Sequence, residues 1–406
     1  VSILGFGQRG NVYAETIKKN IDEVELVKVC EINKDKHQPI KTLFDLSDDD
    51  LFTSEDDFFK KKWSDILIIS TMDKDHYVQV MKALDLGYDI LLEKPIALAK
   101  SEILAIKDKA KQLQRKIAVA HVLRYTMFYE IIKQIIDEKQ IGDIVTLSQT
   151  ENVGYFHYVH SYVRGNWHNS KESSPMILAK SCHDLDIIRY LVGKKVKKLS
   201  SFGNLFYFKE ENAPKDSAIY CKDCKVDCPF NAIDFYKKNP EWMKIFTLKS
   251  DVDLVFKDES LNYGRCVYKM DNDVVDHQVV NLEFEHGSTA SFVMTGFSNE
   301  NHRSLKIHGT KGELNADMDD FIITIKPYGK PIKYLDLRDY TNDFSYHGGG
   351  DHRLLMDFIH AVKDELPFKT DIKDSIESHI LALDAEKSRL DGGHVIDLSN
   401  QWDTYQ

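Results

Sequence analysis

The sequence lacks any apolar run of about 18 residues, so we expect no segment to span a membrane. Cysteine is scarce, with six residues in 406, which excludes a disulfide-dense secreted domain and favours a reducing, cytoplasmic setting. Positive charge is in deficit as well. The formal net charge is −11, which argues against nucleic acid as the main partner. The sequence contains no internal repeat and no low-complexity segment.

The length of the chain predicts two domains, because one ordinary hydrophobic core does not serve 406 residues. The hydrophobic fraction of 42% is typical of a globular protein. No signal peptide precedes the first predicted strand. The chain begins at Val1 inside that strand and without Met, so residues can precede it and the lack of a signal decides nothing.

The first residues carry the motif on which the rest of the interpretation depends. Residues 1–4 predict a short strand, a Gly-x-Gly-x-x-Gly turn follows, and residues 11–17 predict a helix. This order is the fingerprint of a dinucleotide-binding unit, in which the start of the helix faces the pyrophosphate. A glycine-rich loop without a ligand is the alternative. The cofactor-binding residues expected in this turn are Gly5, Phe6, Gly7, Gln8, Arg9 and Gly10.

An acidic residue ends the second predicted strand. Glu31 follows residues 26–30, where it can accept hydrogen bonds from the adenosine ribose and repel a 2′-phosphate. The sequence therefore favours NAD, although Lys34 is close enough in sequence to meet the extra phosphate of NADP. Further cofactor contacts are expected near the ends of later strands, from Thr71, His76, Glu93 and Lys94.

Alternating strands and helices over residues 1–121 predict an N-terminal Rossmann domain, which is a doubly wound parallel sheet. From residue 144 onward the strands are longer and alternate in polarity, and residues 279–297 are typical of a hairpin. Residues 122–406 are therefore expected to form a substrate-binding α+β domain with an open, largely antiparallel sheet. Within it, residues 209–264 form a charged, cysteine-containing insertion with little regular pattern.

The Glu93-Lys94-Pro95 triplet ends another predicted strand. Ligands of open α/β sheets bind at the carboxyl ends of the strands. A residue before proline is held extended, so Lys94 projects from a stiff backbone and could move a substrate hydroxyl proton as hydride leaves the carbon. The alternative is a solvated lysine beside a turn.

Several motifs in one order give the chain a resemblance to the Gfo/Idh/MocA family of sugar and inositol oxidoreductases. The resemblance covers nearly the whole chain apart from the insertion. It implies that Lys94 is the catalytic lysine, that His183 is the active-site histidine, and that the substrate is a sugar, polyol or derivative. The motifs are the glycine turn, Glu31, Glu93-Lys94-Pro95, His121-x-x-Arg124-Tyr125 and Cys182-His183-Asp184-Leu185-Asp186.

The chain departs from the family pattern at one position. Many members have an Asp four residues before the histidine, where this chain has Ala179, followed by Lys180. We hypothesise that Lys94, Lys180 and His183 surround the reacting hydroxyl, since two neighbouring ammonium groups depress each other's pKa. Equally, Lys180 could pair with Asp184 or Asp186 and only hold the start of the helix.

Residues 155–168 combine aromatic and polar side chains, and as a strand they would suit a sugar pocket. A subunit interface is the alternative, because tyrosine, tryptophan and arginine are enriched there too. His347 precedes three glycines that would allow close approach to a ligand, and Asp351 is then either part of that site or a helix N-cap. The expected substrate contacts are Arg124, Tyr125, His160, Arg164, Trp167, His183 and His347.

Four of the six cysteines are candidates for a metal site. Cys221, Cys224 and Cys228 are clustered in the insertion, and Cys266 follows it. Four thiolates could hold a structural zinc and stabilise a segment without a core of its own. The spacing beyond Cys-x-x-Cys is imperfect, so free thiols are the alternative.

The motifs together predict an NAD(P)-dependent oxidoreductase acting on a sugar, inositol or related polyol. Two alternatives remain open: an NAD-dependent glycoside hydrolase that oxidises its substrate transiently, and a non-catalytic NAD-linked sensor. An exposed face on the second sheet would favour a homo-oligomer, a dimer or tetramer, by analogy.

Overall fold

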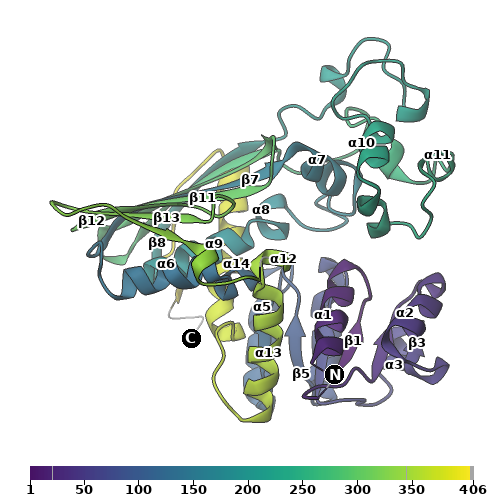
Figure 1. The fold of residues 1–406 in the computed structure, drawn as a ribbon, viewed down its shortest axis with the longest axis horizontal. Helices are drawn as coiled ribbons and strands as arrows, with labels where there is room; N and C mark the ends of the chain where they lie inside the picture. The colour runs from purple at the N-terminus through teal and green to yellow at the C-terminus, as the bar shows by residue number, and fades with distance from the viewer. Residues whose placement is uncertain (21, 344, 403–406) are drawn as a thin grey trace.

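The chain folds around two β-sheets in a computed structural model, which describes residues 1–20, 22–343 and 345–402 (Figure 1). Within these residues the first sheet has six parallel strands in the order β3-β2-β1-β4-β5-β6. This is the strand order of a dinucleotide-binding Rossmann sheet. Its strands are β1 (Ser2–Leu4), β2 (Lys28–Cys30), β3 (Leu51–Phe52), β4 (Ile66–Ile69), β5 (Asp89–Leu92) and β6 (Ile117–Val119).

The predicted alternation of strands and helices in this domain is confirmed. All four residues of β4 are buried, as expected for a strand covered on both faces. Gly87 follows the fourth helix with a φ of +80°, the left-handed conformation that ends many helices. The helices are α1 (Gln8–Lys19), α2 (His37–Phe44), α3 (Glu55–Phe58), α4 (His76–Asp85) and α5 (Lys100–Leu113).

The second sheet is open and largely antiparallel, as predicted. Its order is β14-β13-β12-β11-β7-β10-β9-β8-β15, and β7 runs parallel to β10. The predicted hairpin is β9 and β10, joined through residues 285–288. The strands are β7 (Ile144–Gly154), β8 (Val196–Asn204), β9 (His277–Phe284), β10 (Thr289–Ser298), β11 (His302–Gly309), β12 (Gly312–Asp317), β13 (Ile322–Pro327), β14 (Lys333–Asp336) and β15 (Ile396–Asp397).

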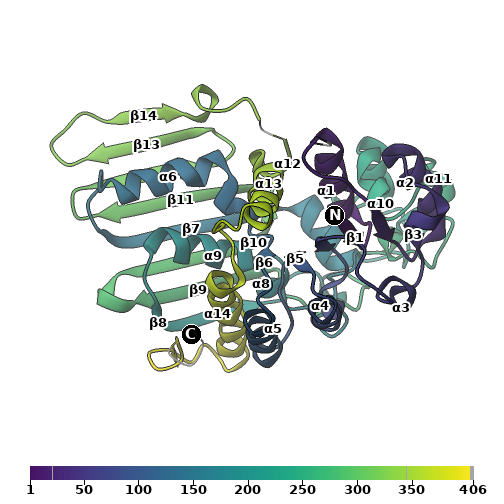
Figure 2. The same cartoon turned by 90° about the horizontal axis from the view of Figure 1, so that it is seen from below.

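Helices α6 (Met127–Asp137), α9 (Cys182–Val192) and α14 (Ile372–Leu390) lie over one face of this sheet (Figure 2). Residues that alternate along β7 and β10 therefore face either this helical layer or the other side of the sheet. On the other side, Thr289 donates to Thr146 and Ser291 to Ser148, at exposed positions. The second sheet thus has one covered face and one polar face.

The two sheets are divided at residue 121, but the hydrophobic cores are not, because residues of the C-terminal helices join the core of the first domain. Helix α13 (Gly350–Lys363) packs on α1, and its Leu354 and Phe358 join the buried cluster that contains Ile3. The backbone of Val119 donates to Thr370 at the edge of the first sheet. The end of the chain therefore completes the N-terminal domain. No helix in the described residues is long and apolar enough to cross a membrane.

The insertion has more structure than its sequence pattern indicated. It contains α10 (Ala232–Lys238) and α11 (Val252–Val255), and it lies beside α7 (Tyr155–Tyr158) at the upper right of Figure 1. Tyr236 and Phe256 are buried in a separate small cluster. The expectation of a segment without a core was therefore wrong, because its aromatic residues are spaced irregularly and pack only after the turns form.

Residues 155–164 do not form the strand on which the alternation of this segment was conditional. Gly154 ends β7, residues 155–158 form α7, and residues 159–164 continue as a π-helical turn. Aromatic and β-branched residues favour strands locally. Here tertiary packing overrides that preference, because the helical turn places both His160 and Arg164 against the insertion.

Candidate active site

The glycine turn between β1 and α1 is built for a phosphate. Gly5 has a φ of +87°, and a Cβ at Gly10 would lie 2.3 Å from the carbonyl oxygen of Gly5, so neither position accepts a side chain. Gly7 has no atom within 4 Å of the place where a Cβ would stand. That open space beside the start of α1 fits a pyrophosphate, which binds to helix N-termini. The residues present therefore fit a dinucleotide.

Glu31 lies at the carboxyl end of β2, as predicted. Its carboxylate accepts hydrogen bonds from the backbone N–H of Phe6 at 3.1 Å and of Asn33 at 2.8 Å. The nearby cation is Lys36, whose Nζ lies 3.5 Å from Glu31 and 3.2 Å from the carbonyl oxygen of Phe6. Lys36, rather than Lys34, is therefore the lysine beside Glu31.

Thr71 and His76 support the loops at the sheet edge. One ring nitrogen of His76 lies 2.6 Å from the carbonyl oxygen of Pro95, and the other lies 3.3 Å from that of Thr71. The Thr71 hydroxyl donates to Gln79. The Lys94–Pro95 peptide bond is cis. His76 thus joins the loop after β4 to the loop that carries Lys94.

Lys94 reaches from the first domain to the second. Its Nζ donates a hydrogen bond of 2.7 Å to the carbonyl oxygen of Ala179. Ala179 ends α8 (Met176–Ala179), and α9, which carries His183, begins at Cys182. The two residues that the family resemblance singled out, Lys94 and His183, therefore lie on facing elements of the two domains.

Lys180 lies between α8 and α9 and pairs with neither of the carboxylates that the sequence proposed. Its Nζ is 3.2 Å from Glu151 of β7. Burial lowers the pKa of Lys180 below its usual value, and the charge of Glu151 opposes this. Asp184 and Asp186 are held instead by Arg303 and Arg124.

His183 is buried, and its Nδ1 has no hydrogen-bond partner among the described residues. Burial, with the charge of Lys94 next in size, holds its pKa well below the usual range, so His183 is neutral. Its ring lies 6.1 Å from that of His121 and 6.5 Å from that of His347, between ring centroids. In the part of the chain that the structure describes, no carboxylate is hydrogen-bonded to Nδ1 of His183.

Arg9 and Glu93 belong to a network inside the protein. Arg9 donates to Glu93 through Nε and to Asp351 through Nη2, each at 2.5 Å, and Tyr13 donates to Glu93 at 2.6 Å. Asp351 in turn lies 2.9 Å from Nδ1 of His347. Burial opposes ionisation of Glu93, but Arg9 and Lys94 hold its pKa below the usual value. The predicted cofactor residues Arg9 and Glu93 therefore use their side chains to join the glycine turn to the lysine loop.

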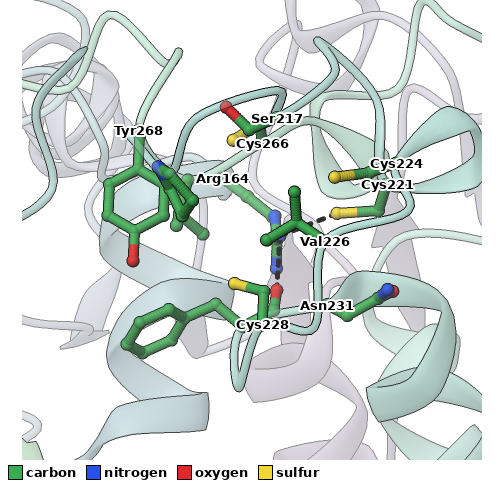
Figure 3. A pocket seen from close by; sticks show the side chains of 12 residues that line it. Arg164, Ser217, Cys221, Cys224, Val226, Cys228, Asn231, Cys266 and Tyr268 are labelled. Atoms are coloured by element: carbon green, nitrogen blue, oxygen red, sulfur yellow. Dashed lines mark hydrogen bonds between the residues drawn. The ribbon is translucent and has the colours of Figure 1, made fainter. Parts of the chain in front are cut away.

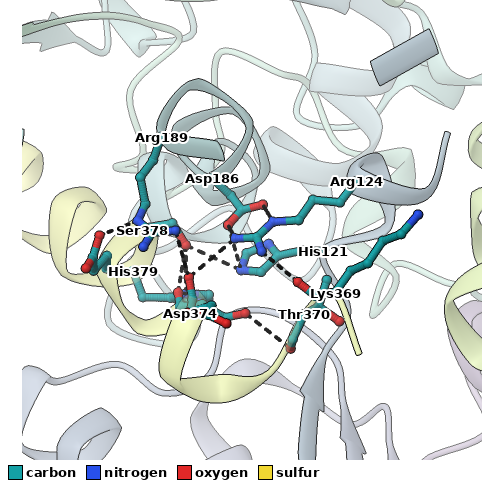
Figure 4. Close-up of polar contacts among 11 residues, drawn as sticks. His121, Arg124, Asp186, Arg189, Lys369, Thr370, Asp374, Ser378 and His379 are labelled. Carbon is teal, nitrogen blue, oxygen red and sulfur yellow. Dashed lines mark hydrogen bonds and ion pairs between the residues drawn. The ribbon is translucent and has the colours of Figure 1, made fainter. Parts of the chain in front are cut away.

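Arg124 and Tyr125 were expected to contact substrate, and the structure places them in the scaffold. Figure 4 shows Arg124 beside Asp186 and His121. Arg124 forms two hydrogen bonds with Asp186, of 2.7 and 2.5 Å, and is buried. His121 lies 3.6 Å from the same carboxylate. Tyr125 donates to Asp357 at 2.7 Å. These contacts tie α9 to the C-terminal helices, so we leave Arg124 and Tyr125 out of the proposed site.

Three more of the expected substrate contacts form hydrogen bonds within the protein: His160, Arg164 and Trp167. His160 lies 2.7 Å from the hydroxyl of Tyr236 in the insertion. Arg164 donates at 2.7 Å to the carbonyl oxygens of Arg265 and Phe230. Trp167 donates to Asp73, with 3.2 Å to each carboxylate oxygen, across the two domains. These polar groups have hydrogen-bond partners within the protein, so we leave them out of the proposed site.

The four cysteines expected to bind zinc line one small pocket around Arg164 (Figure 3). Nη2 of Arg164 lies 3.4 Å from Sγ of Cys221. In the ranges the structure describes, no three His, Cys, Asp or Glu side chains are placed to hold a metal ion. A guanidinium among the thiols also repels a second cation. The arrangement supports free thiols over a zinc site.

One acidic residue beside the site was missed from the sequence. Glu151 holds Lys180 and also lies 2.6 Å from Arg303. A signal for Glu151 was available, because it occupies a covered position of β7 in alternation with Leu147, Gln149 and Val153. A carboxylate at a covered strand position requires a buried partner.

Comparison with known proteins defines the class to which this fold and site belong. Residues 1–121 match the family model described as an oxidoreductase family with an NAD-binding Rossmann fold. Residues 129–315 match the GFO/IDH/MocA C-terminal domain. The two matches together span most of the chain, which is therefore an NAD-binding oxidoreductase. It belongs to the GFO/IDH/MocA family.

Individual relatives are distant. The chain is 24% identical over 325 residues to the putative oxidoreductase YteT of Bacillus subtilis, covering 75% of this chain and 74% of YteT. It is 25% identical over 222 residues to the scyllo-inositol 2-dehydrogenase (NAD(+)) of the same organism, covering 54% of this chain and 61% of the enzyme. A crystal structure of the WlbA dehydrogenase from Chromobacterium violaceum with NADH and UDP-GlcNAcA has a TM-score of 0.70 at 17% identity, over 98% of this chain and 95% of WlbA.

Proposed function

We propose that this protein oxidises a carbinol carbon of a sugar, inositol or related polyol and passes the hydride to NAD. The observation that carries the proposal is the hydrogen bond from Lys94 at the edge of the Rossmann sheet to Ala179. In the second domain Ala179 is followed directly by Lys180 and, four positions on, by His183. Ligands of such sheets bind at this edge. The site therefore lies between the cofactor half and the substrate half of the molecule.

Bound NAD would supply the hydride acceptor, and the protein's own residues would bind and orient it. The backbone at Gly7 and the start of α1 would hold the pyrophosphate. Glu31 would accept hydrogen bonds from the ribose hydroxyls. The carboxylate of Glu31 also disfavours a 2′-phosphate, which supports NAD as the cofactor. Lys36 lies beside Glu31, so NADP is the competing ligand to be measured.

Lys94 and Lys180 would act on the substrate hydroxyl. Each ammonium group has an internal acceptor, Ala179 for Lys94 and Glu151 for Lys180, which holds its position. A substrate hydroxyl could bind between them. Burial lowers the pKa of Lys180, and the charge of Glu151 opposes this. Neutral His183 would face the same hydroxyl as a hydrogen-bond partner.

The substrate class is supported by the names of two relatives. One is an NAD-dependent scyllo-inositol 2-dehydrogenase of Bacillus subtilis, and another is a glucose-6-phosphate 3-dehydrogenase of the same organism. Both names describe oxidation of a ring carbinol.

The polar open face of the second sheet supports association of the chain with a second copy.

The experiment is to identify nucleotide released from denatured protein and then to follow NAD reduction across inositols, sugars, sugar phosphates and aryl glycosides. We expect exchangeable NAD, reduced in the presence of one polyol class. Lys94→Ala should lower kcat/KM by about 100-fold or more while NAD still binds. A matched control is Lys82→Ala, an exposed lysine of α4 that pairs with Asp56.

Other outcomes assign a different function. Cleavage of an aryl glycoside by protein that retains NAD, without net reduction, would identify a hydrolase that oxidises its substrate transiently. Binding of NAD with no turnover that depends on Lys94 would identify a sensor. Failure to bind any dinucleotide would overturn the proposal.

A further inference from the structure

We propose that the His347–Asp351 pair is the proton acceptor of this active site, and that it replaces the acidic residue missing at Ala179. The inference rests on the proposed oxidation of a carbinol. Many family members carry an Asp where this chain has Ala179, and Nδ1 of His183 has no hydrogen-bond partner among the described residues. His121, the other histidine beside His183, is buried against Asp186, whereas His347 is partly exposed and is paired with Asp351.

His347 has the geometry of an oriented base. Its Nδ1 lies 2.9 Å from Oδ2 of Asp351, and its ring centroid lies 6.5 Å from that of His183. When Nδ1 donates its proton to a carboxylate, Nε2 is left as an acceptor. The His347 side chain is 41% exposed, so a proton taken up there can pass to solvent.

The backbone around His347 is held in an unusual conformation. His347 has a φ of +49°, and Gly348 and Gly349 follow with φ values of +59° and +75°. A non-glycine residue pays a conformational cost in the left-handed region, and such residues gather at functional sites. Here the turn brings the imidazole of His347 back toward the first turn of α13, where Asp351 lies.

Asp351 is kept ionised by the nucleotide-binding turn. Burial opposes its charge, but Arg9 and His347 lower the pKa of Asp351 to about 2. Arg9 bridges Asp351 to Glu93, the residue before Lys94. Arg9 is thus a positioning residue that holds the acceptor pair and the lysine loop in one frame.

The groups around His347 are consistent with this role. Asp351 of α13 is its direct partner, and Arg9 of α1 lies behind that carboxylate. His183 of α9 faces the ring and is neutral, because burial and Lys94 hold its pKa well below the usual range. Asp343 packs against Gly349 at the base of the turn. His347 therefore lies between the carboxylate of Asp351 and the neutral imidazole of His183.

The substrate C–H bond breaks and its electron pair leaves as hydride to NAD, while the hydroxyl O–H bond breaks and its proton passes to Nε2 of His347. A carbonyl group, NADH and an imidazolium are formed. Asp351 stabilises the imidazolium, which then releases its proton to solvent.

The first test needs no substrate. In NAD-loaded protein with ¹⁵N-labelled histidine, the His347 signals are assigned by their loss in His347→Gln. We expect the proton on Nδ1 and a bare Nε2, and a loss of this preference in Asp351→Asn. A proton found on Nε2 in the wild-type protein would overturn the proposal, because the acceptor would then be blocked.

The second test uses the polyol found in the substrate panel. His347→Gln should lower kcat/KM at least about 100-fold and remove the acidic limb of its pH profile, with NAD affinity unchanged. Asp351→Asn should have a smaller effect, which Asp351→Glu partly restores. The control is His360→Gln. His360 lies on α13, as Asp351 does, and its exposed pair with Glu23 is lost in this variant.

The two proposals fail in different ways. If no polyol reduces NAD, the proposed function is wrong. The ring nitrogen of His347 that carries the proton then still shows whether Asp351 orients His347 as an acceptor. If a polyol is oxidised and His347→Gln stays within about threefold of wild type, the pair is only structural. An acidic limb that survives in His347→Gln and disappears in His183→Gln would assign the proton to His183 instead.

Discussion

The edge of the Rossmann sheet and the base of the insertion are both rich in charged and aromatic residues, yet they serve different purposes. At the sheet edge, the backbone around Gly7 is open and Lys94 extends to the facing domain. At the base of the insertion, His160 and Arg164 are buried and form hydrogen bonds with Tyr236 and with the backbone of Phe230. A polar cluster becomes a candidate site only where some of its groups remain available to a ligand.

The difference follows from how each region is held. Parallel strands end at one edge, so the loops after β1, β2, β4 and β5 meet there, and the place of a Cβ at Gly7 is open. The insertion has only a small aromatic core around Tyr236. It therefore needs the side chains of the π-helical turn as anchors, and these are no longer available to a substrate.

The largest effect is expected from breaking the ion pair of Arg124, which the sequence would assign to substrate binding. Arg124→Met should destabilise the protein by about 3–5 kcal/mol, because Asp186 would remain buried without its partner. Urea unfolding measures this. Arg338→Met, in an exposed pair with Asp336, is the control and should change stability by less than about 1 kcal/mol. Unchanged stability with a raised KM would return Arg124 to the substrate site.

Two glycines of the same turn should respond in opposite ways. Gly10→Val should cost about 3 kcal/mol, because its Cβ would collide with the backbone of Gly5. Gly7→Val should leave stability within about 0.5 kcal/mol and abolish NAD binding, because its side chain would fill the open space. Denaturation and NAD titration of both variants separate the two effects. Normal NAD binding by Gly7→Val would place the pyrophosphate elsewhere.

Arg164→Met tests the other region. We expect a local destabilisation of about 3 kcal/mol from the lost hydrogen bonds to Arg265 and Phe230. Limited proteolysis should then cut within residues 209–264, while NAD affinity stays at the wild-type value. Lys222→Met, which removes an exposed pair with Glu259, is the matched control. An intact insertion with weakened substrate binding would show that Arg164 belongs to the site.

The smallest effect is the pH dependence due to Asp351. Its pKa is about 2 in the folded protein and 3.8 as the ordinary value, with burial outweighed by Arg9 and His347. The ionised carboxylate therefore stabilises the fold above pH 3.8, and this stability, about 2 kcal/mol, is lost as the pH falls toward 2. Urea unfolding at several pH values should show a shallower loss in Asp351→Asn. Identical slopes would contradict the buried network.

Much of the Rossmann domain was predictable because its signals are local. The glycine turn, the buried run of β4 and Gly87 after α4 are each contained in a few neighbouring residues. The hairpin of β9 and β10 was equally local. The helical conformation of residues 155–164 was not predictable, because it depends on packing against the insertion.

The candidate site was predictable only in part. Lys94 and His183 came from motifs, and the structure places them on facing elements. The partner of Lys180 was missed because Glu151 lies on β7, whose position relative to α8 is set by the fold of the whole second domain. The zinc site stays a prediction: within the described residues no three side chains are placed to hold a metal ion, because clustering of cysteines in sequence does not by itself orient their thiols in space.

By itself, the sequence determined the class of cofactor, the parallel sheet and the lysine at its edge, since each depends on short spacings that backbone geometry dictates. Only the tertiary structure decided which charged groups meet. Arg9 and Asp351 are 342 positions apart, and no local pattern relates them. They meet because α13 packs on α1 and completes the core of the first domain, which places the carboxylate, the guanidinium and His347 beside Lys94's loop.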